Sequence, residues 1–299
     1  MRFDSYHPMI NLIYFVGAIT CTICFQQPVF LAISFLCAFV YFVKLRGVKA
    51  LLLNLAFSVF AAGYAVWYAY YNHFGVTNLR VNFIGNHITL ESLVYGLVLG
   101  ITIAAVLMWC CCIFTLITAD KIVYLFGRVS PRLSLFLSIL LRTVPRVKTR
   151  AVRIEVSREG IGRGIRQGNI LQKLLHFFSL VSILITWTLE DFVESAASMK
   201  SRGYSLKGRT AFSIYRFDNR DRGFVIAFFL CLTFVLMAVL FGQTDIYYNP
   251  EIVMNRITPV SYVFYGGYTV FLLLPMGLQM AGEYRFRKLR KKAVQSEEN

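Results

Sequence analysis

Two short stretches place an arginine between small residues near the expected end of a helix. They are Gly162-Arg163-Gly164 and Ser201-Arg202-Gly203, and their arginines lie 39 positions apart. A guanidinium at a helix end can form a bidentate pair with a carboxylate on a partner, which a lysine does less specifically. A simpler role is also open, because the helix dipole stabilises any cation near a helix C-terminus. The residue types fit both interpretations.

Motifs for other chemistry are absent from the sequence. No Gly-x-x-x-x-Gly-Lys-Ser/Thr stretch occurs, so we expect no ATP hydrolysis and predict that the chain is not an enzyme. His-Glu-x-x-His and Gly-x-Ser-x-Gly are absent as well. The four histidines are scattered (His7, His73, His87 and His176), and the seven cysteines all lie in apolar runs. We therefore predict no metal site, no bound cofactor and unreactive thiols.

The composition indicates a membrane protein. Of 299 residues, 57% are apolar and only 15% are charged, and the mean hydropathy is +0.60. Soluble domains carry about 25% charged residues. Apolar runs that approach the roughly 20 residues needed to cross a bilayer occur at 9–25, 28–43, 50–71, 92–118, 224–242 and 259–281. The sequence thus predicts an all-α polytopic integral membrane protein with about six transmembrane helices.

The positive charge is concentrated in one third of the chain. Residues 121–223 contain 19 Lys and Arg against 7 Asp and Glu, within a formal net charge of +16 for the whole chain. Basic loops remain in the cytoplasm, so topology explains this charge without a nucleic-acid partner. We predict three parts: N-terminal transmembrane helices at 1–120, cytoplasmic coupling helices at 121–223, and C-terminal transmembrane helices with a basic tail at 224–299. We expect the chain in the cell (plasma) membrane, with both termini in the cytoplasm.

The basic segment also contains two apolar stretches, Leu133–Leu141 and Leu174–Leu189. The first is too short to span a bilayer, and the second is marginally long enough. We favour long amphipathic helices that lie along or just under the membrane, although an additional membrane hairpin would leave the topology of the other loops unchanged. Pro131 suits an early helix position, and Pro145 is expected to stop or kink a helix.

Charged residues along the basic segment predict helical pairs and helix ends. Glu155 is spaced for an i,i+3 pair with Arg158, and Glu159 for an i,i+4 pair with Arg163. Gly203 is expected to take the left-handed conformation that ends a helix, which would place Arg202 at the helix terminus.

Several of these stretches resemble one family. His7-Pro8, Thr118-Ala-Asp-Lys121, Leu141-Arg-Thr-Val-Pro145 and Ala197-Ser-Met-Lys-Ser-Arg-Gly-Tyr204 are similar to stretches of the transmembrane T component of energy-coupling factor (ECF) transporters, the CbiQ-like family. Gly162-Arg163-Gly164 falls where the first Ala-Arg-Gly signature of that family is expected. In both signatures of this chain another small residue, Gly162 or Ser201, replaces the alanine.

The resemblance implies a coupling subunit of an ABC importer for vitamin or metal-ion (cobalt) uptake. In that family the T component joins two ABC-type ATPases, which hold ATP and Mg, to a substrate-binding S component in the membrane. The resemblance assigns ATPase coupling to Gly162, Arg163, Gly164, Ser201, Arg202 and Gly203, with Arg158 and Gly160 as a possible alternative first motif. It assigns contact with the S component to Leu133, Leu137, Leu141, Leu175 and Phe178.

Three other functions remain open. The simplest is a membrane anchor that uses its basic helices only to bind lipid. A stand-alone secondary transporter would need polar groups near the membrane midplane, but Glu91, Asp120 and Glu283 lie at the ends of expected spans. A lipid-facing membrane enzyme would use the basic segment to bind anionic headgroups and would need a convergent acid-base or metal set. We find no such set in the sequence.

Overall fold

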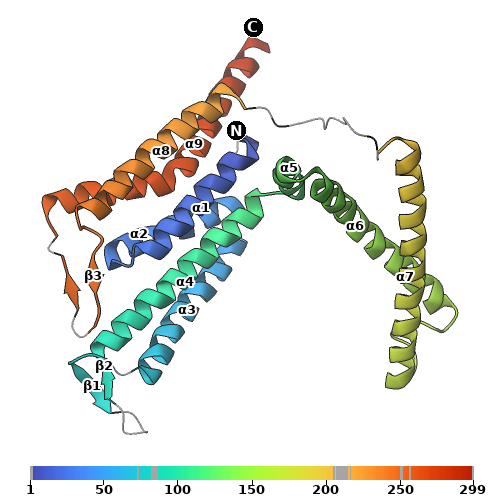
Figure 1. Cartoon of the computed structure of the whole chain (residues 1–299), viewed down its shortest axis with the longest axis horizontal. Helices are drawn as coiled ribbons and strands as arrows, with labels where there is room; N and C mark the ends of the chain where they lie inside the picture. Colours follow the sequence, from blue (N-terminus) through green and yellow to red (C-terminus); the bar gives the residue numbers. More distant parts are fainter. Residues whose placement is uncertain are drawn as a thin grey trace. The chain divides into compact units, whose positions relative to one another are not determined.

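A computed structural model describes residues 3–72, 74–81, 87–204, 206, 215, 217–249, 252–255 and 257–297. It is built almost entirely of helices (Figure 1). The helices are η1 (Phe3–Ser5), α1 (Pro8–Cys24), α2 (Pro28–Arg46), α3 (Val48–Tyr71), α4 (Leu90–Leu116), α5 (Ala119–Val129), α6 (Pro131–Gly160), α7 (Ile170–Ser201), α8 (Asn219–Leu240) and α9 (Pro259–Glu297). Two short antiparallel hairpins pair β1 (Asn78–Val81) with β2 (His87–Thr89) and β3 (Ile246–Tyr247) with β4 (Val253–Met254).

Six helices in the described residues are long and apolar enough to cross a bilayer: α2, α3, α4, α7, α8 and residues Pro259–Lys288 of α9. The predicted all-α polytopic class is therefore confirmed. The set differs from the expected one at two places. The 9–25 run forms α1, which has only 17 residues, and α7, which we expected to lie along the membrane, meets the length and hydropathy of a span.

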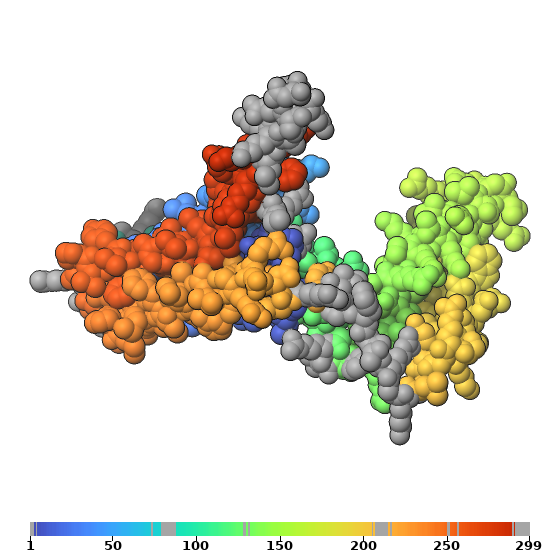
Figure 2. Space-filling view, turned by 90° about the horizontal axis from the view of Figure 1, so that it is seen from above, coloured from blue at the N-terminus to red at the C-terminus, as the bar shows by residue number. Residues whose placement is uncertain are grey.

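The chain divides into two compact units. Residues 1–118 and 215–299 form the first unit, and residues 119–214 form the second. The N-terminal and C-terminal helices thus pack together, and Figure 2 shows α8 and α9 side by side in orange and red. The basic segment contributes α5, α6 and α7 to a unit of its own.

The core of the first unit is aromatic. Tyr14, Tyr41, Trp109, Tyr268 and Phe271 are all fully buried, and their rings belong to α1, α2, α4 and α9. Tyr14 and Trp109 meet edge to face with ring centroids 6.3 Å apart. Aromatic pairs of this kind contribute about 0.5–1.5 kcal/mol beyond the burial of their area.

Small residues bring α3 and α4 into close contact. A Cβ atom at Gly100 would lie 2.5 Å from the carbonyl oxygen of Ala61, and one at Gly96 would lie 2.9 Å from that of Ala65. Gly96 and Gly100 are one turn apart on α4, as are Ala61 and Ala65 on α3. This small-xxx-small packing is typical of helices that associate within membranes.

A buried hydrogen-bond network joins three helices of the first unit. The hydroxyls of Thr22 on α1 and Ser34 on α2 are 2.6 Å apart. The indole Nε1 of Trp109 on α4 donates to the Ser34 hydroxyl at 3.2 Å. Because unsatisfied polar groups are costly in a bilayer, these bonds favour one arrangement of the three helices.

In the second unit, α6 and α7 form an antiparallel hairpin. Arg150 of α6 forms an ion pair with Asp191 of α7. Further along, the Arg158 guanidinium donates to the Ser179 hydroxyl at 2.7 Å. The first apolar stretch, Leu133–Leu141, lies on α6, and the second, Leu174–Leu189, lies on α7, so both belong to long helices as expected.

The two prolines of α6 behave differently. Pro131 occupies the first turn, as predicted, where its missing N–H costs no helical hydrogen bond. Pro145 lies inside the helix, which continues to Gly160. Of the two predicted effects of Pro145, a stop or a kink, the stop is wrong, because α6 continues on both sides of it.

Candidate functional site

The end of α7 presents Arg202 at the C-cap position. Gly203 follows with φ of +77°, its N–H donates to the Lys200 carbonyl at 3.1 Å, and the Tyr204 N–H donates to the Met199 carbonyl at 3.1 Å. This is a Schellman motif, which closes the helix at a left-handed glycine. The prediction that Gly203 stops the helix and leaves Arg202 at its terminus is confirmed.

The end of α6 has the same motif with a different residue at the cap. Gly162 has φ of +77°, its N–H donates to the Glu159 carbonyl at 3.1 Å, and the Arg163 N–H donates to the Arg158 carbonyl at 2.9 Å. Ile161 is therefore the C-cap residue. Arg163 follows the left-handed glycine, whereas Arg202 precedes it, so the two signatures are not geometrically equivalent.

Both signature arginines have exposed side chains. Within the residues that the structure describes, neither Arg163 nor Arg202 forms a side-chain hydrogen bond or ion pair. The predicted pairs Glu155–Arg158 and Glu159–Arg163 do not form. The side chains of Arg158 and Glu155 bond elsewhere, and Arg163 lies beyond the end of α6, so it has no helical spacing from Glu159. The two guanidiniums are accordingly available to a partner.

Arg158, the arginine of the alternative first motif, has an intramolecular role. Its Nε donates to the Arg163 carbonyl oxygen at 3.3 Å, and its Nη1 reaches Ser179 on α7. Gly160 is exposed and is the last residue of α6. This geometry favours Arg163 over Arg158 as the arginine that faces outward.

The loop that carries Arg163 is held by side-chain hydrogen bonds that the sequence did not predict. The Glu155 carboxylate accepts a hydrogen bond from the Ile165 N–H at 2.7 Å. Gln167 bonds in both directions: its Oε1 accepts from the Gly164 N–H at 3.1 Å, and its Nε2 donates to the Glu159 carbonyl at 3.2 Å. No spacing rule would have predicted these bonds, because they depend on the path of the loop.

Gly164 is buried against the preceding helix, so its role differs from that of an exposed tip residue. A Cβ there would lie 3.3 Å from the Cα and Cβ of Glu159. Its φ is not positive, so space rather than backbone conformation makes glycine suitable. On the other helix, Ser201 is exposed, and its hydroxyl donates to the Ser198 carbonyl at 2.8 Å.

The apolar residues assigned to contact with an S component are largely uncovered within the second unit. Leu133, Leu141, Leu175 and Phe178 are exposed, and Leu137 is half-buried. Leu180 is the one buried residue of α7. A helix this apolar and this exposed needs lipid or protein around it.

Metal-binding geometry is absent from the described part of the chain, where no group of three or more His, Cys, Asp or Glu side chains could hold an ion. His73 lies outside the described residues. The seven cysteines form no disulfide.

Comparisons with known proteins assign no family. No family model matches the chain, and no curated protein matches it.

Proposed function

We propose that this chain is the membrane coupling subunit of an ECF-type ABC importer, located in the cell membrane with both termini in the cytoplasm. It would bind two ABC-type ATPases, which hold ATP and Mg, and an S component that carries a vitamin or metal ion. The observation that carries the proposal is Arg202, exposed and unpaired at the C-cap of α7. The resemblance of the residues around Arg202 to the T component suggests that the partner is an ABC-type ATPase.

The position of Arg202 supports docking over simple dipole compensation. Lys200 already places a cation in the last turn of α7, as the helix dipole favours. Arg202 lies two residues beyond Lys200, where the Schellman motif fixes the conformation of the backbone. A guanidinium at this position can enter a groove and pair with both oxygens of a carboxylate through two of its three nitrogens.

Arg163 would form the second docking point. Its loop is braced by Glu155, Gln167 and Arg158, so its backbone is also held in place. Because the two arginines differ in their position relative to the glycine, the two ATPase grooves would receive them with different geometry. This asymmetry fits a pair of different ATPases better than a pair of identical ones.

Co-purification tests the proposal. The tagged chain is expressed with the ABC-type ATPases of its own genome and extracted in detergent, and two ATPases per chain are expected. Arg202→Ala and Arg163→Ala should each lose ATPase, because removing one partner of a buried charge pair costs about 2–5 kcal/mol. Lys200→Ala and Arg166→Ala are the matched controls, since each removes a nearby exposed cation. Full ATPase recovery with both signature variants, or no ATPase with the unmodified chain, would refute it.

The S-component surface needs a separate test. Leu175→Ser with Phe178→Ser should lose the S component while the ATPases remain, because these side chains are exposed and apolar. Ser182→Ala changes an exposed polar position of the same helix and should have no effect. Transport by the purified chain alone in liposomes would instead favour a stand-alone carrier.

A further inference from the structure

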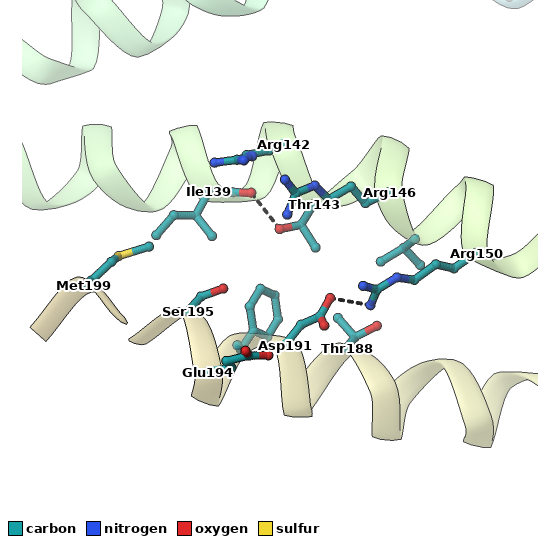
Figure 3. Close-up of a pocket in the computed structure, with 12 residues that line it drawn as sticks. Ile139, Arg142, Thr143, Arg146, Arg150, Thr188, Asp191, Glu194, Ser195 and Met199 are labelled. Atoms are coloured by element: carbon teal, nitrogen blue, oxygen red, sulfur yellow. Dashed lines mark hydrogen bonds and ion pairs between the residues drawn. The ribbon is translucent and has the colours of Figure 1, made fainter. Parts of the chain in front are cut away.

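A groove between α6 and α7 has an arginine-rich wall (Figure 3). Its volume is about 250 Å³. Arg142, Arg146 and Arg150 line it from α6, where they follow one another at intervals of one helical turn and so share a face. Asp191 and Glu194 line it from α7. All five belong to the second unit of the chain.

The charged side chains of the groove sum to a net charge of +1, because three arginines face two carboxylates. Arg150 is paired with Asp191. Arg142 and Arg146 form no hydrogen bond or ion pair with their side chains within the described residues, and neither does Glu194. Two guanidiniums facing one carboxylate match the single negative charge of a phosphodiester. The groove therefore has a positive net charge and favours an anionic ligand.

The other lining residues are apolar in part. Ile139 and Val147 of α6 and Phe192 and Met199 of α7 contribute hydrocarbon to the walls. Exposed apolar side chains continue along α7 from the groove, at Leu189 and Ile185. A water-soluble phosphate compound would leave this apolar surface in contact with water, whereas the acyl chains of a lipid would cover it.

The groove lies between two apolar stretches of the hairpin. On α6 the apolar stretch ends at Leu141, before Arg142, and on α7 it ends at Leu189, before Glu190. Because the helices are antiparallel, these stretches flank the groove at its two ends. A charged groove between two apolar stretches suits a hairpin that lies in the membrane interface, at the level of the lipid headgroups.

We propose that this groove binds the headgroup of one anionic phospholipid. The phosphate lies between the guanidiniums of Arg142 and Arg146, and the acyl chains run over α7 from Phe192 toward Leu189. The proposal goes beyond the coupling function and is independent of it, because neither arginine is a docking residue and no ATPase takes part in the test.

Native mass spectrometry of the full-length chain in detergent tests the site. The chain is titrated with phosphatidylglycerol, and one tightly bound lipid is expected. Arg142→Gln with Arg146→Gln should weaken its binding about thirtyfold, given the contribution of each basic residue near an anionic lipid. Arg132→Gln with Lys148→Gln is the matched control, because it removes two exposed cations of α6 outside the groove and should leave binding within about twofold.

Three outcomes would overturn the proposal. They are equal losses in the groove and control variants, equal affinity for phosphatidylcholine, and equal affinity for glycerophosphoglycerol, which has the headgroup without acyl chains. If the double variant does not fold, the single variants Arg142→Gln and Arg146→Gln should each weaken binding about fivefold. Single variants that fold and bind lipid like the unmodified chain would contradict the site.

Discussion

The Nε of Arg158 donates a hydrogen bond to the backbone oxygen of Arg163, 3.3 Å away. One arginine at the end of α6 thus holds the backbone from which the other projects. The same guanidinium contacts Ser179 on α7, so the loop between the two helices is tied to both of them. This arrangement separates two residues that look interchangeable in the sequence: Arg158 positions the loop, and Arg163 faces outward.

Arg158→Gln should loosen the loop between α6 and α7. The substitution removes the bonds to Arg163 and Ser179, so backbone amides of 161–169 should exchange with deuterium faster by about threefold to tenfold, as the loss of a partly exposed hydrogen bond implies. Hydrogen exchange with mass spectrometry measures this. Arg153→Gln, which removes an exposed cation without a side-chain partner in the described residues, should leave the exchange rates unchanged.

Gly203→Ala should destabilise the end of α7. Its φ of +77° is left-handed, and a non-glycine residue there costs about 1–2 kcal/mol. Gly160→Ala is the opposite case, because Gly160 is helical, has open space around its Cα and should gain up to about 1 kcal/mol from alanine. Thermal unfolding followed by circular dichroism compares the two. Equal stability of the two variants would contradict the Schellman geometry.

Gly100→Ala should destabilise the packing of α3 against α4. The new methyl would meet the Ala61 carbonyl oxygen at 2.5 Å, and overpacking of this kind costs about 1–3 kcal/mol. Gly63→Ala places a methyl where nothing lies within 4 Å and should not destabilise the protein. A melting temperature in detergent that falls only for Gly100→Ala is the expected result.

Ser34→Ala should weaken the buried network of the first unit. Its hydroxyl contacts both Thr22 and the indole of Trp109, so the substitution leaves the indole N–H unsatisfied at a cost of about 1–3 kcal/mol. Unfolding and the fluorescence of Trp109 should both change. Thr115→Ala removes an exposed hydroxyl on the same helix as Trp109 and should change neither. Unaltered stability in Ser34→Ala would argue against the network.

Cysteine labelling tests whether α7 lies along the membrane or spans it. In a chain whose own cysteines are replaced by alanine, Asn169→Cys and Ser201→Cys mark the two ends of the helix. If α7 lies along the membrane, as we expect, a membrane-impermeant maleimide should reach both positions from the cytoplasmic side. Labelling from opposite sides would establish α7 as a span.

Hydropathy by itself determined the fold class and most of the apolar helices. Each of these features depends on residues close together in the chain, so a local pattern predicts it. The left-handed glycine after α7 was predictable for the same reason, because one residue type fits that conformation. The apolar stretch of α7 was also evident, but Leu174–Leu189 is only marginally long enough to span a bilayer, so an amphipathic surface helix was the preferred interpretation.

Only the tertiary structure decided which arginine faces outward and which faces inward. The bonds of Arg158 to Ser179 and of Arg150 to Asp191 join residues that are 21 and 41 positions apart, so their partners depend on how α7 returns along α6. The i,i+3 rule favoured Glu155 as the partner of Arg158, but Arg158 bonds to a hydroxyl on the next helix and Glu155 to a loop N–H. A sequence states which side chains can pair, and the folded backbone determines which of them come within reach.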